Sequence, residues 1–104
     1  MADPPDPRNP DPRPKLSRKH TRTLAAVFER PTRGDVEWSA AVALVRKLGA
    51  TVNEKRAGSR VAFALGGRVF VVHKPHPGSE LSKGSVESLR EFLRAAKMTP
   101  DSFS

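Results

Sequence analysis

The sequence predicts an α+β fold of two layers, with two helices on one face of a three-stranded antiparallel sheet. Two observations lead to this prediction. Apolar residues recur at helical spacing over residues 38–48 and again over 86–96. Between these segments, two apolar runs flank a glycine pair, which is typical of a β-hairpin. The expected order is helix, three strands, helix, and the second face of the sheet is left to solvent or to a partner.

Size and charge limit the classes of protein to consider. The 104 residues suffice for one domain, and 19 Lys and Arg against 11 Asp and Glu give a formal net charge of +8. Such a charge favours nucleic acid, an anionic membrane surface or an acidic protein as partner. The absence of cysteine excludes disulfides and Cys-based zinc sites and suits a reducing cytoplasm. With neither a membrane-length apolar run nor a signal-peptide core, we expect a cytoplasmic protein that does not contact membranes.

Residues 1–22 are expected to form a disordered, proline-rich basic tail, and residues 23–104 the folded domain. Six prolines within residues 1–14 remove backbone donors and fix φ, which prevents a helix or a strand there. Six cations lie between residues 8 and 22, against Asp11 as the single acid. This run suits a phosphate-contacting arm and, equally, a solubilising tail.

Three segments have helical character. The apolar stretch 23–28, which a proline soon ends, is expected to form one or two turns packed on the core. Asp35 or Ser39 can cap the first full helix, and Gly49 suits its end. Its apolar face consists of Trp38, Ala41, Val42, Val45 and Leu48. Ser85 can cap the second helix, which a proline closes. The apolar face of that helix consists of Val86, Leu89, Phe92, Leu93 and Ala96.

Three strand-like runs separate the helices. Residues 50–55 favour a short strand. Residues 60–65 alternate between apolar and other side chains, and residues 68–73 return after Gly66-Gly67, whose freedom at positive φ suits a two-residue turn. The prolines and glycine of residues 74–78 end the strand pairing.

Cations and a serine around the hairpin form a candidate phosphate-binding surface. The turn 55–60 carries three cations and free backbone donors, so it can cradle a phosphate or be an ordinary polar turn. Arg68, Lys74 and Lys83 are expected to extend it into a basic stripe, since Arg60 and Arg68 flank the same hairpin. The expected RNA-binding residues are Lys55, Arg56, Ser59, Arg60, Arg68, Lys74 and Lys83.

Two histidines lie close to these cations in the sequence. His76, between two prolines, can transfer a proton at a phosphodiester, and packing within the loop is the alternative of equal weight. His73 is in register with Val69 and Val71, so we expect its ring on the apolar face of the sheet in a structural, hydrogen-bonded role. Only Glu80 lies near this pair of histidines, so no metal site is expected. No phosphate-loop or dinucleotide motif occurs, so no cofactor is expected.

Together these features resemble the HicA-type toxins of bacterial toxin–antitoxin systems. The resemblance rests on Gly58-Ser59, the Val/Phe hairpin, His76-Pro77-Gly78, Glu80-Leu81, Lys83-Gly84 and the closing apolar helix. It covers about residues 38–99, and segment 21–37 resembles the N-terminal extension of a HicA-like subgroup. The family implies a double-stranded-RNA-binding-like α-β-β-β-α fold. It also implies a small mRNA interferase that binds and cuts RNA and is neutralised by a HicB-type antitoxin.

At one position the chain departs from the family pattern. Where the family has an essential histidine after Gly-Ser, this sequence has Arg60, which stays protonated and suits a phosphate clamp better than a base. The resemblance therefore implies RNA binding and antitoxin pairing more than cleavage. We expect Ser59 and Arg60 to contact the substrate phosphate and His76 to be the catalytic residue of a metal-independent endoribonuclease, with His73 as the alternative proton carrier. The alternatives are a non-catalytic RNA- or DNA-binding module and a protein-interaction module.

Overall fold

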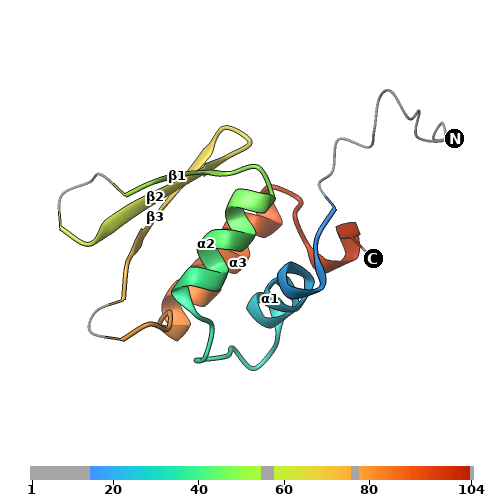
Figure 1. Cartoon of the computed structure of the whole chain (residues 1–104), viewed down its shortest axis with the longest axis horizontal. Helices are drawn as coiled ribbons and strands as arrows, with labels where there is room; N and C mark the ends of the chain where they lie inside the picture. Colours follow the sequence, from blue (N-terminus) through green and yellow to red (C-terminus); the bar gives the residue numbers. More distant parts are fainter. Residues whose placement is uncertain (1–14, 55–57, 76–77, 104) are drawn as a thin grey trace, which may run out of the picture.

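The described part of the chain contains a three-stranded sheet with two helices on one of its faces (Figure 1). A third helix crosses that pair of helices. The computed structural model describes residues 15–54, 58–75 and 78–103. The sheet has the order β1-β2-β3 and both pairings are antiparallel. Its strands are β1 (Thr51–Asn53), β2 (Arg60–Leu65) and β3 (Arg68–His73). This arrangement confirms the predicted α+β class, the antiparallel sheet and the open second face.

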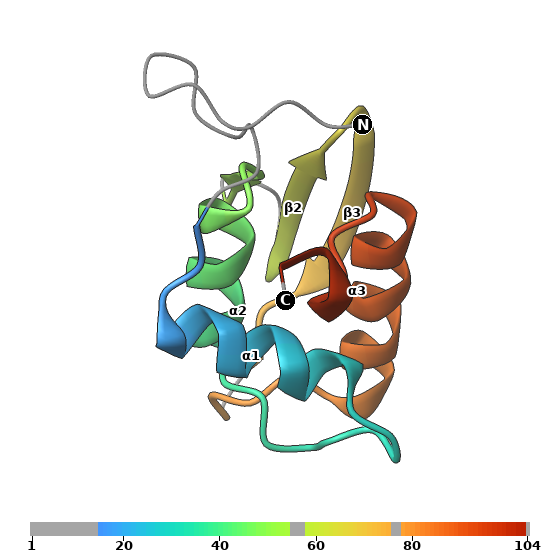
Figure 2. The same ribbon diagram turned by 90° about the vertical axis from the view of Figure 1, so that its right-hand side faces the viewer.

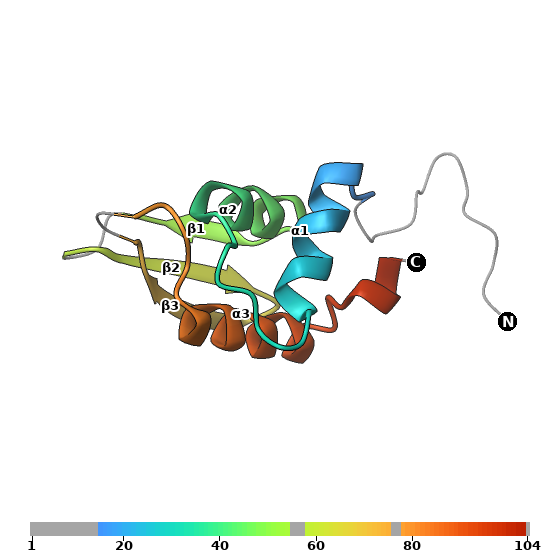
Figure 3. The ribbon, with the colours of Figure 1, turned by 90° about the horizontal axis from the view of Figure 1, so that it is seen from below.

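The two predicted helices cover the same face of this sheet. They are α2 (Trp38–Lys47) and α3 (Lys83–Ala95). α2 packs against β1 and α3 packs against β3, so each helix supports one edge of the sheet. Viewed from below, α2 lies beside the β1 edge of the sheet and α3 beside the β3 edge (Figure 3). The short helix η1 (Pro100–Phe103) follows α3 and packs against the helix that crosses the pair.

The β2–β3 hairpin confirms the predicted turn and fixes which side chains face the core. Gly66 and Gly67 have φ values of 58° and 78°, the left-handed backbone that a two-residue turn of this kind requires. Phe63 lies opposite Phe70 and faces the helices, together with the pair formed by residues 61 and 72. Val69 and Val71 point to the other side and are 65% and 43% exposed. The face away from the helices is therefore open and partly apolar.

A row of four aromatic rings joins both helices to the hairpin. The ring centroids of Trp38 in α2 and Phe63 in β2 lie 5.9 Å apart and stack. Phe63 meets Phe70 of β3 edge-on at 6.0 Å, and Phe70 stacks on Phe92 of α3 at 5.5 Å. Offset stacked and edge-to-face pairs at these distances stabilise a core beyond their buried area. The row therefore fixes the hairpin on the helix layer.

The third helix, α1 (Arg18–Phe28), begins earlier than the sequence predicted. Residues 18–22, assigned to the tail, are its first turns, so the predicted boundary at residue 22 is wrong there. Ser17 caps the helix because its Oγ accepts a hydrogen bond from His20 N at 3.2 Å. Leu24 and Val27 are buried, so this helix is held by tertiary packing as well as by its cap. Residues 1–14 of the predicted tail lie outside the described residues.

α1 crosses α2 and α3 on the side away from the sheet (Figures 1 and 2). A buried arginine of α3 fastens its C-terminal end. Arg90 donates from Nε to the carbonyl oxygen of Val27 at 2.9 Å and from Nη2 to the carbonyl of Glu29 at 3.1 Å. Nη2 also lies 3.1 Å from Thr32 Oγ1, to which it donates. The guanidinium thus supplies hydrogen bonds to carbonyls at the end of the helix, which have no partner within the helix itself.

The start of α2 differs from the predicted capping. Neither Asp35 nor Ser39 caps the helix, and its N-cap is Glu37, without a side-chain bond. Asp35 accepts two hydrogen bonds from Arg33, at 2.7 and 2.8 Å, and this guanidinium holds the pKa of the Asp35 carboxyl below its ordinary value. The amide of Trp38 instead donates to the carbonyl of residue 79 at 2.7 Å, which positions the first turn.

The start of α3 and the extent of β1 also differ from prediction. Ser82, not Ser85, is the N-cap of α3, because Ser82 Oγ accepts from Ser85 N at 3.1 Å. β1 spans only Thr51–Asn53 of the predicted 50–55. Gly49 follows α2 with a φ of 102°, as its predicted place at the helix end requires. Among the described residues, no helix is long and apolar enough to cross a membrane.

Candidate nucleic-acid interface

Four polar side chains meet where β2 begins and β3 ends, and we call them the hairpin-end cluster: Ser59, Arg60, His73 and Lys74. The strand register places Arg60 directly opposite His73 on the open face of the sheet. Ser59 Oγ lies 3.2 Å from Nδ1 of His73, within hydrogen-bond distance. The amide of Lys74 donates to the carbonyl of Ser59 at 2.8 Å. Backbone pairing therefore holds all four residues together, and all four are exposed.

An open hollow of about 280 Å³ lies beside the cluster. Its lining residues are Glu54, Gly58, Ser59, Arg60, Val61 and Lys74. Gly58 has a φ of 69°, and a Cβ built there would meet no atom of the described residues within 4 Å. Ser59, Arg60 and Lys74 thus line one space, and Glu54 is the single carboxylate among its described lining residues. This donor set suits an anion such as a phosphodiester.

Each member of the cluster offers a different chemistry. The planar guanidinium of Arg60 can bind two phosphate oxygens at once, and Lys74 supplies a compact point charge. His73 contributes an imidazole, the kind of side chain that serves as a general acid or base in catalysis. Among the described residues, no group of three potential metal ligands lies together.

The structure brings some of the predicted RNA-binding residues together and separates others. Ser59, Arg60 and Lys74 meet as described above. Arg68 does not join them, since it pairs with Leu65 at the far end of the hairpin. Five residue steps along β2 separate those two ends by roughly 17 Å, and Arg68 points to the other face of the sheet. The predicted continuous basic stripe is therefore wrong at this residue.

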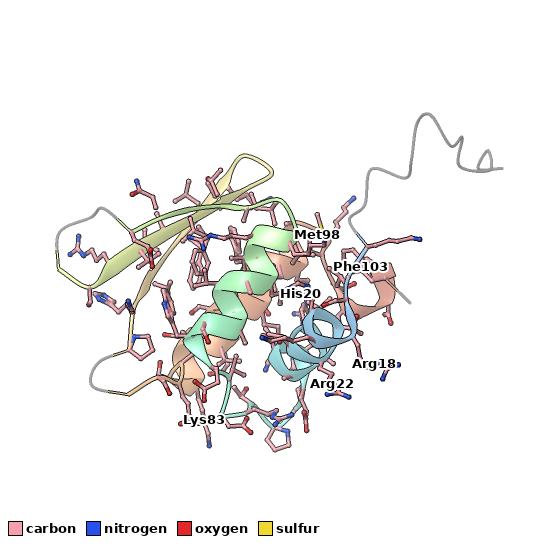
Figure 4. All side chains as sticks on the ribbon, in the orientation of Figure 1. Arg18, His20, Arg22, Lys83, Met98 and Phe103 are labelled. Carbon is pink, nitrogen blue, oxygen red and sulfur yellow. The ribbon has the colours of Figure 1, made fainter. Side chains whose placement is uncertain are left out.

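Lys83 is not among the described residues that line the hollow beside the cluster. It is the first residue of α3, and its Cε would come within 3.3 Å of a Cβ added at Gly34, in the connection between α1 and α2. Figure 4 shows Lys83 at the end of the helix pair where α3 begins. Arg18 and Arg22 project from α1, on the side of the domain away from the sheet. Lys55, Arg56 and His76 lie outside the described residues.

His73 shares a face with Val69 and Val71, as predicted, but that face is the open one. The expectation that its ring lies on the apolar face is therefore wrong, because the face buried under the helices carries Phe70 and Val72, although the ring is within hydrogen-bond distance of Ser59. β3 is apolar on both faces, so its composition does not show which face is buried. The turn does show the pairing, because a two-residue turn at Gly66-Gly67 opposes residues 65 and 68 and hence residues 60 and 73. That signal was sufficient to place His73 beside Arg60.

A known protein family matches most of the described domain. The model of the family described as the HicA toxin of bacterial toxin–antitoxin systems matches residues 38–98, more than half of the chain. The chain belongs to the HicA toxin family. The match runs from the first residue of α2 to just beyond α3 and includes all three strands, while α1 lies outside it. Membership makes the chain a toxin component and implies an antitoxin partner. No curated protein and no solved structure matches it.

Proposed function

We propose that this HicA-family chain binds RNA through the hairpin-end cluster and cuts mRNA as a metal-independent endoribonuclease. In this proposal it acts in the cytoplasm and a HicB-like antitoxin neutralises it. The observation that best supports it is the meeting of two cations, a hydroxyl and an imidazole at one end of an open sheet face. Cleavage of RNA without a metal needs proton transfer at the 2′-hydroxyl and the leaving oxygen, and cations for the phosphorane charge.

Electrostatics supports RNA as the ligand. The formal net charge of the chain is +8, and backbone phosphates supply most of the affinity in complexes of this kind. An A-form RNA displays its 2′-hydroxyls in a wide, shallow groove and is recognised mainly by shape. Affinity should therefore fall steeply with salt and depend little on sequence within a duplex.

Ser59 and Arg60 are assigned to the substrate phosphate in this proposal, and His76 to proton transfer. The first two line the same hollow as Lys74, which adds a second cation. The role of His76 rests on the sequence, in which this histidine lies between two prolines and shortly after the cluster.

The direct test is incubation of the purified chain, without a partner, with a long mRNA in EDTA. Cleavage is expected from the wild type and not from His76→Ala. Cleavage by both proteins would contradict the role of His76 and leave the ribonuclease activity standing. Salt-dependent binding without cleavage would contradict the ribonuclease activity.

Binding without cleavage is the second candidate function, and the identity of Arg60 favours it. An arginine stays protonated at neutral pH and cannot act as the base. If the natural chain only binds RNA, Arg60→His is expected to create cleavage in EDTA. A silent Arg60→His variant that still binds RNA would count against an inactivated nuclease scaffold.

Removal of either cluster cation should weaken RNA binding. Arg60→Gln and Lys74→Gln are each expected to lower affinity by roughly tenfold, because a hydrogen bond to a charged group is lost. Each should also reduce the salt slope by about one counterion. Fluorescence anisotropy with a labelled RNA duplex at several salt concentrations measures both quantities.

Arg68→Gln is the matched control for this prediction. It removes the same unit of charge from the same hairpin at its far end. Its affinity should remain within about threefold of the wild type, since long-range attraction is screened over about 8–10 Å in physiological salt. Equal losses in all three variants would show a diffuse charge effect and contradict a localised site.

A further inference from the structure

The orientation of the His73 ring leaves one of its nitrogens for a ligand. Nδ1 lies 3.2 Å from Ser59 Oγ, and no described residue is hydrogen-bonded to Nε2. A hydrogen bond to one ring nitrogen fixes the tautomer and the direction in which the other nitrogen points. Ser59 thus holds an exposed imidazole in place at the end of β3.

Two hollows lie at the end of the sheet where His73 is found, and His73 itself lines the second of them. The first, described above, contains Ser59, Arg60 and Lys74. The second, of about 360 Å³, runs between β3 and the start of α3. Its lining residues are Phe70, Val71, Val72, His73, Ser82, Gly84, Ser85 and Ser88. An RNA strand that crosses the end of β3 would occupy both hollows and pass over the imidazole of His73.

Two cations lie close to His73, where they could contact the same RNA phosphate. Arg60 is the cross-strand partner of His73, and opposed residues of an antiparallel pair have Cβ atoms about 4.5–5.5 Å apart. Lys74 is the next residue along the chain. The other described histidine, His20, lies in α1 and its Nδ1 is 2.9 Å from Ser17 Oγ, at the opposite end of the domain (Figure 4). Only His73 therefore combines an imidazole with these cations in the described residues.

We propose that His73 is the general base of the reaction, an inference that rests on the proposed ribonuclease function. Nε2 of neutral His73 accepts the 2′-hydroxyl proton while the 2′ oxygen bonds to the adjacent phosphorus and the bond from phosphorus to the 5′ oxygen breaks. The leaving 5′ oxygen takes its proton from the proton-transfer group assigned under the proposed function, and exchange with water then returns both groups to their starting protonation states. The products are a 2′,3′-cyclic phosphate and a 5′-hydroxyl. Arg60 and Lys74 stabilise the phosphorane charge, and Ser59 positions the ring.

The test compares His73→Ala and His20→Ala with the wild type in EDTA. His73→Ala is expected to cut RNA more slowly by ~10²–10⁴-fold, the usual loss for a proton-transfer group. RNA affinity should change less than threefold, because the cations remain, and this retained binding also shows that the exposed substitution leaves the fold intact. His20→Ala removes the other described histidine and should cut at the wild-type rate.

The pH dependence separates a base from a residue that only supports the site. The pH profile of the wild-type rate should have an acid limb, and the residual rate of His73→Ala should lack it. An RNA with a single 2′-deoxy substitution at the cut position should stay intact. A slow His73→Ala variant with an unchanged acid limb would contradict the proposal.

The remaining outcomes show whether the role of His73 or the proposed function is wrong. If the wild type and His73→Ala cut equally fast, the inference is wrong and the ribonuclease function stands. If the wild type binds RNA and does not cut it, the inference and the cleavage fall together while RNA binding stands. If the wild type neither binds nor cuts, the proposed function itself is wrong.

Discussion

Phe63→Ala is expected to lower the free energy of unfolding by about 3–5 kcal/mol, as is usual for a buried aromatic residue. The side chain is 1% exposed and contacts the rings of both Trp38 and Phe70. Its removal leaves a cavity at the centre of the aromatic row and separates the hairpin from α2. Urea unfolding followed by tryptophan fluorescence measures the change, since Trp38 is the one tryptophan of the chain and stacks on the mutated ring.

The matched control for this prediction lies on the same hairpin. Val69 is 65% exposed on the open face, so Val69→Ala should change stability by less than about 0.5 kcal/mol. Phe63→Leu keeps part of the volume and should lose about 1–2 kcal/mol, which keeps a measurable folded state if Phe63→Ala does not fold. Equal stability of the Ala variants at the two positions would contradict the assignment of the core to the helix side of the sheet.

The elements that could be predicted from the sequence are those whose local signals agree with their packing. The hairpin was predicted with its bounds because Gly66-Gly67 and the alternation in residues 60–65 point to the same pairing. The start of α1 was missed because Arg18, Lys19 and Arg22 resemble a continuation of the basic tail. Their helical state depends on Leu24 and Val27 packing against other elements, and a charge count does not contain that information.

The candidate site was predicted in part for a similar reason. Ser59 and Arg60 are adjacent in sequence, so their grouping needed no tertiary information. Arg68 was included because closeness in the sequence suggested closeness in space, whereas a hairpin puts residues near its turn far from residues at its open end. The face of His73 depends on which side of β3 the helices cover, and Val69 and Phe70 are equally apolar choices. The register with β2 decides between them, because Phe70 lies opposite Phe63, which faces the helices, whereas Val69 lies opposite Ala64.

Arg90→Ala is expected to lower the free energy of unfolding by about 3 kcal/mol, because hydrogen bonds to a charged donor are lost and their acceptors remain. Arg90 is 3% exposed and donates to the carbonyls of Val27 and Glu29 and to Thr32 Oγ1. These acceptors belong to the part of the chain before the family match, while Arg90 lies within it. Chemical denaturation measures the loss, and Arg94→Ala is the control. Arg94 is an exposed arginine one turn further along α3 and should cost less than about 1 kcal/mol.

Hydrogen exchange shows what Arg90 holds in place. If its role is to fasten α1 onto the two helices beneath it, amides of α1 in Arg90→Ala should exchange faster than those of β2 and β3. Contacts of α1 with the rest of the domain are made with α2, α3 and η1, so α1 can open while the sheet stays paired. The RNA binding proposed for the hairpin-end cluster should then persist, since the cluster lies at the opposite end of the domain (Figure 3). Uniformly faster exchange across all elements would instead show that α1 and the sheet unfold as one cooperative unit, and that Arg90 stabilises the whole fold.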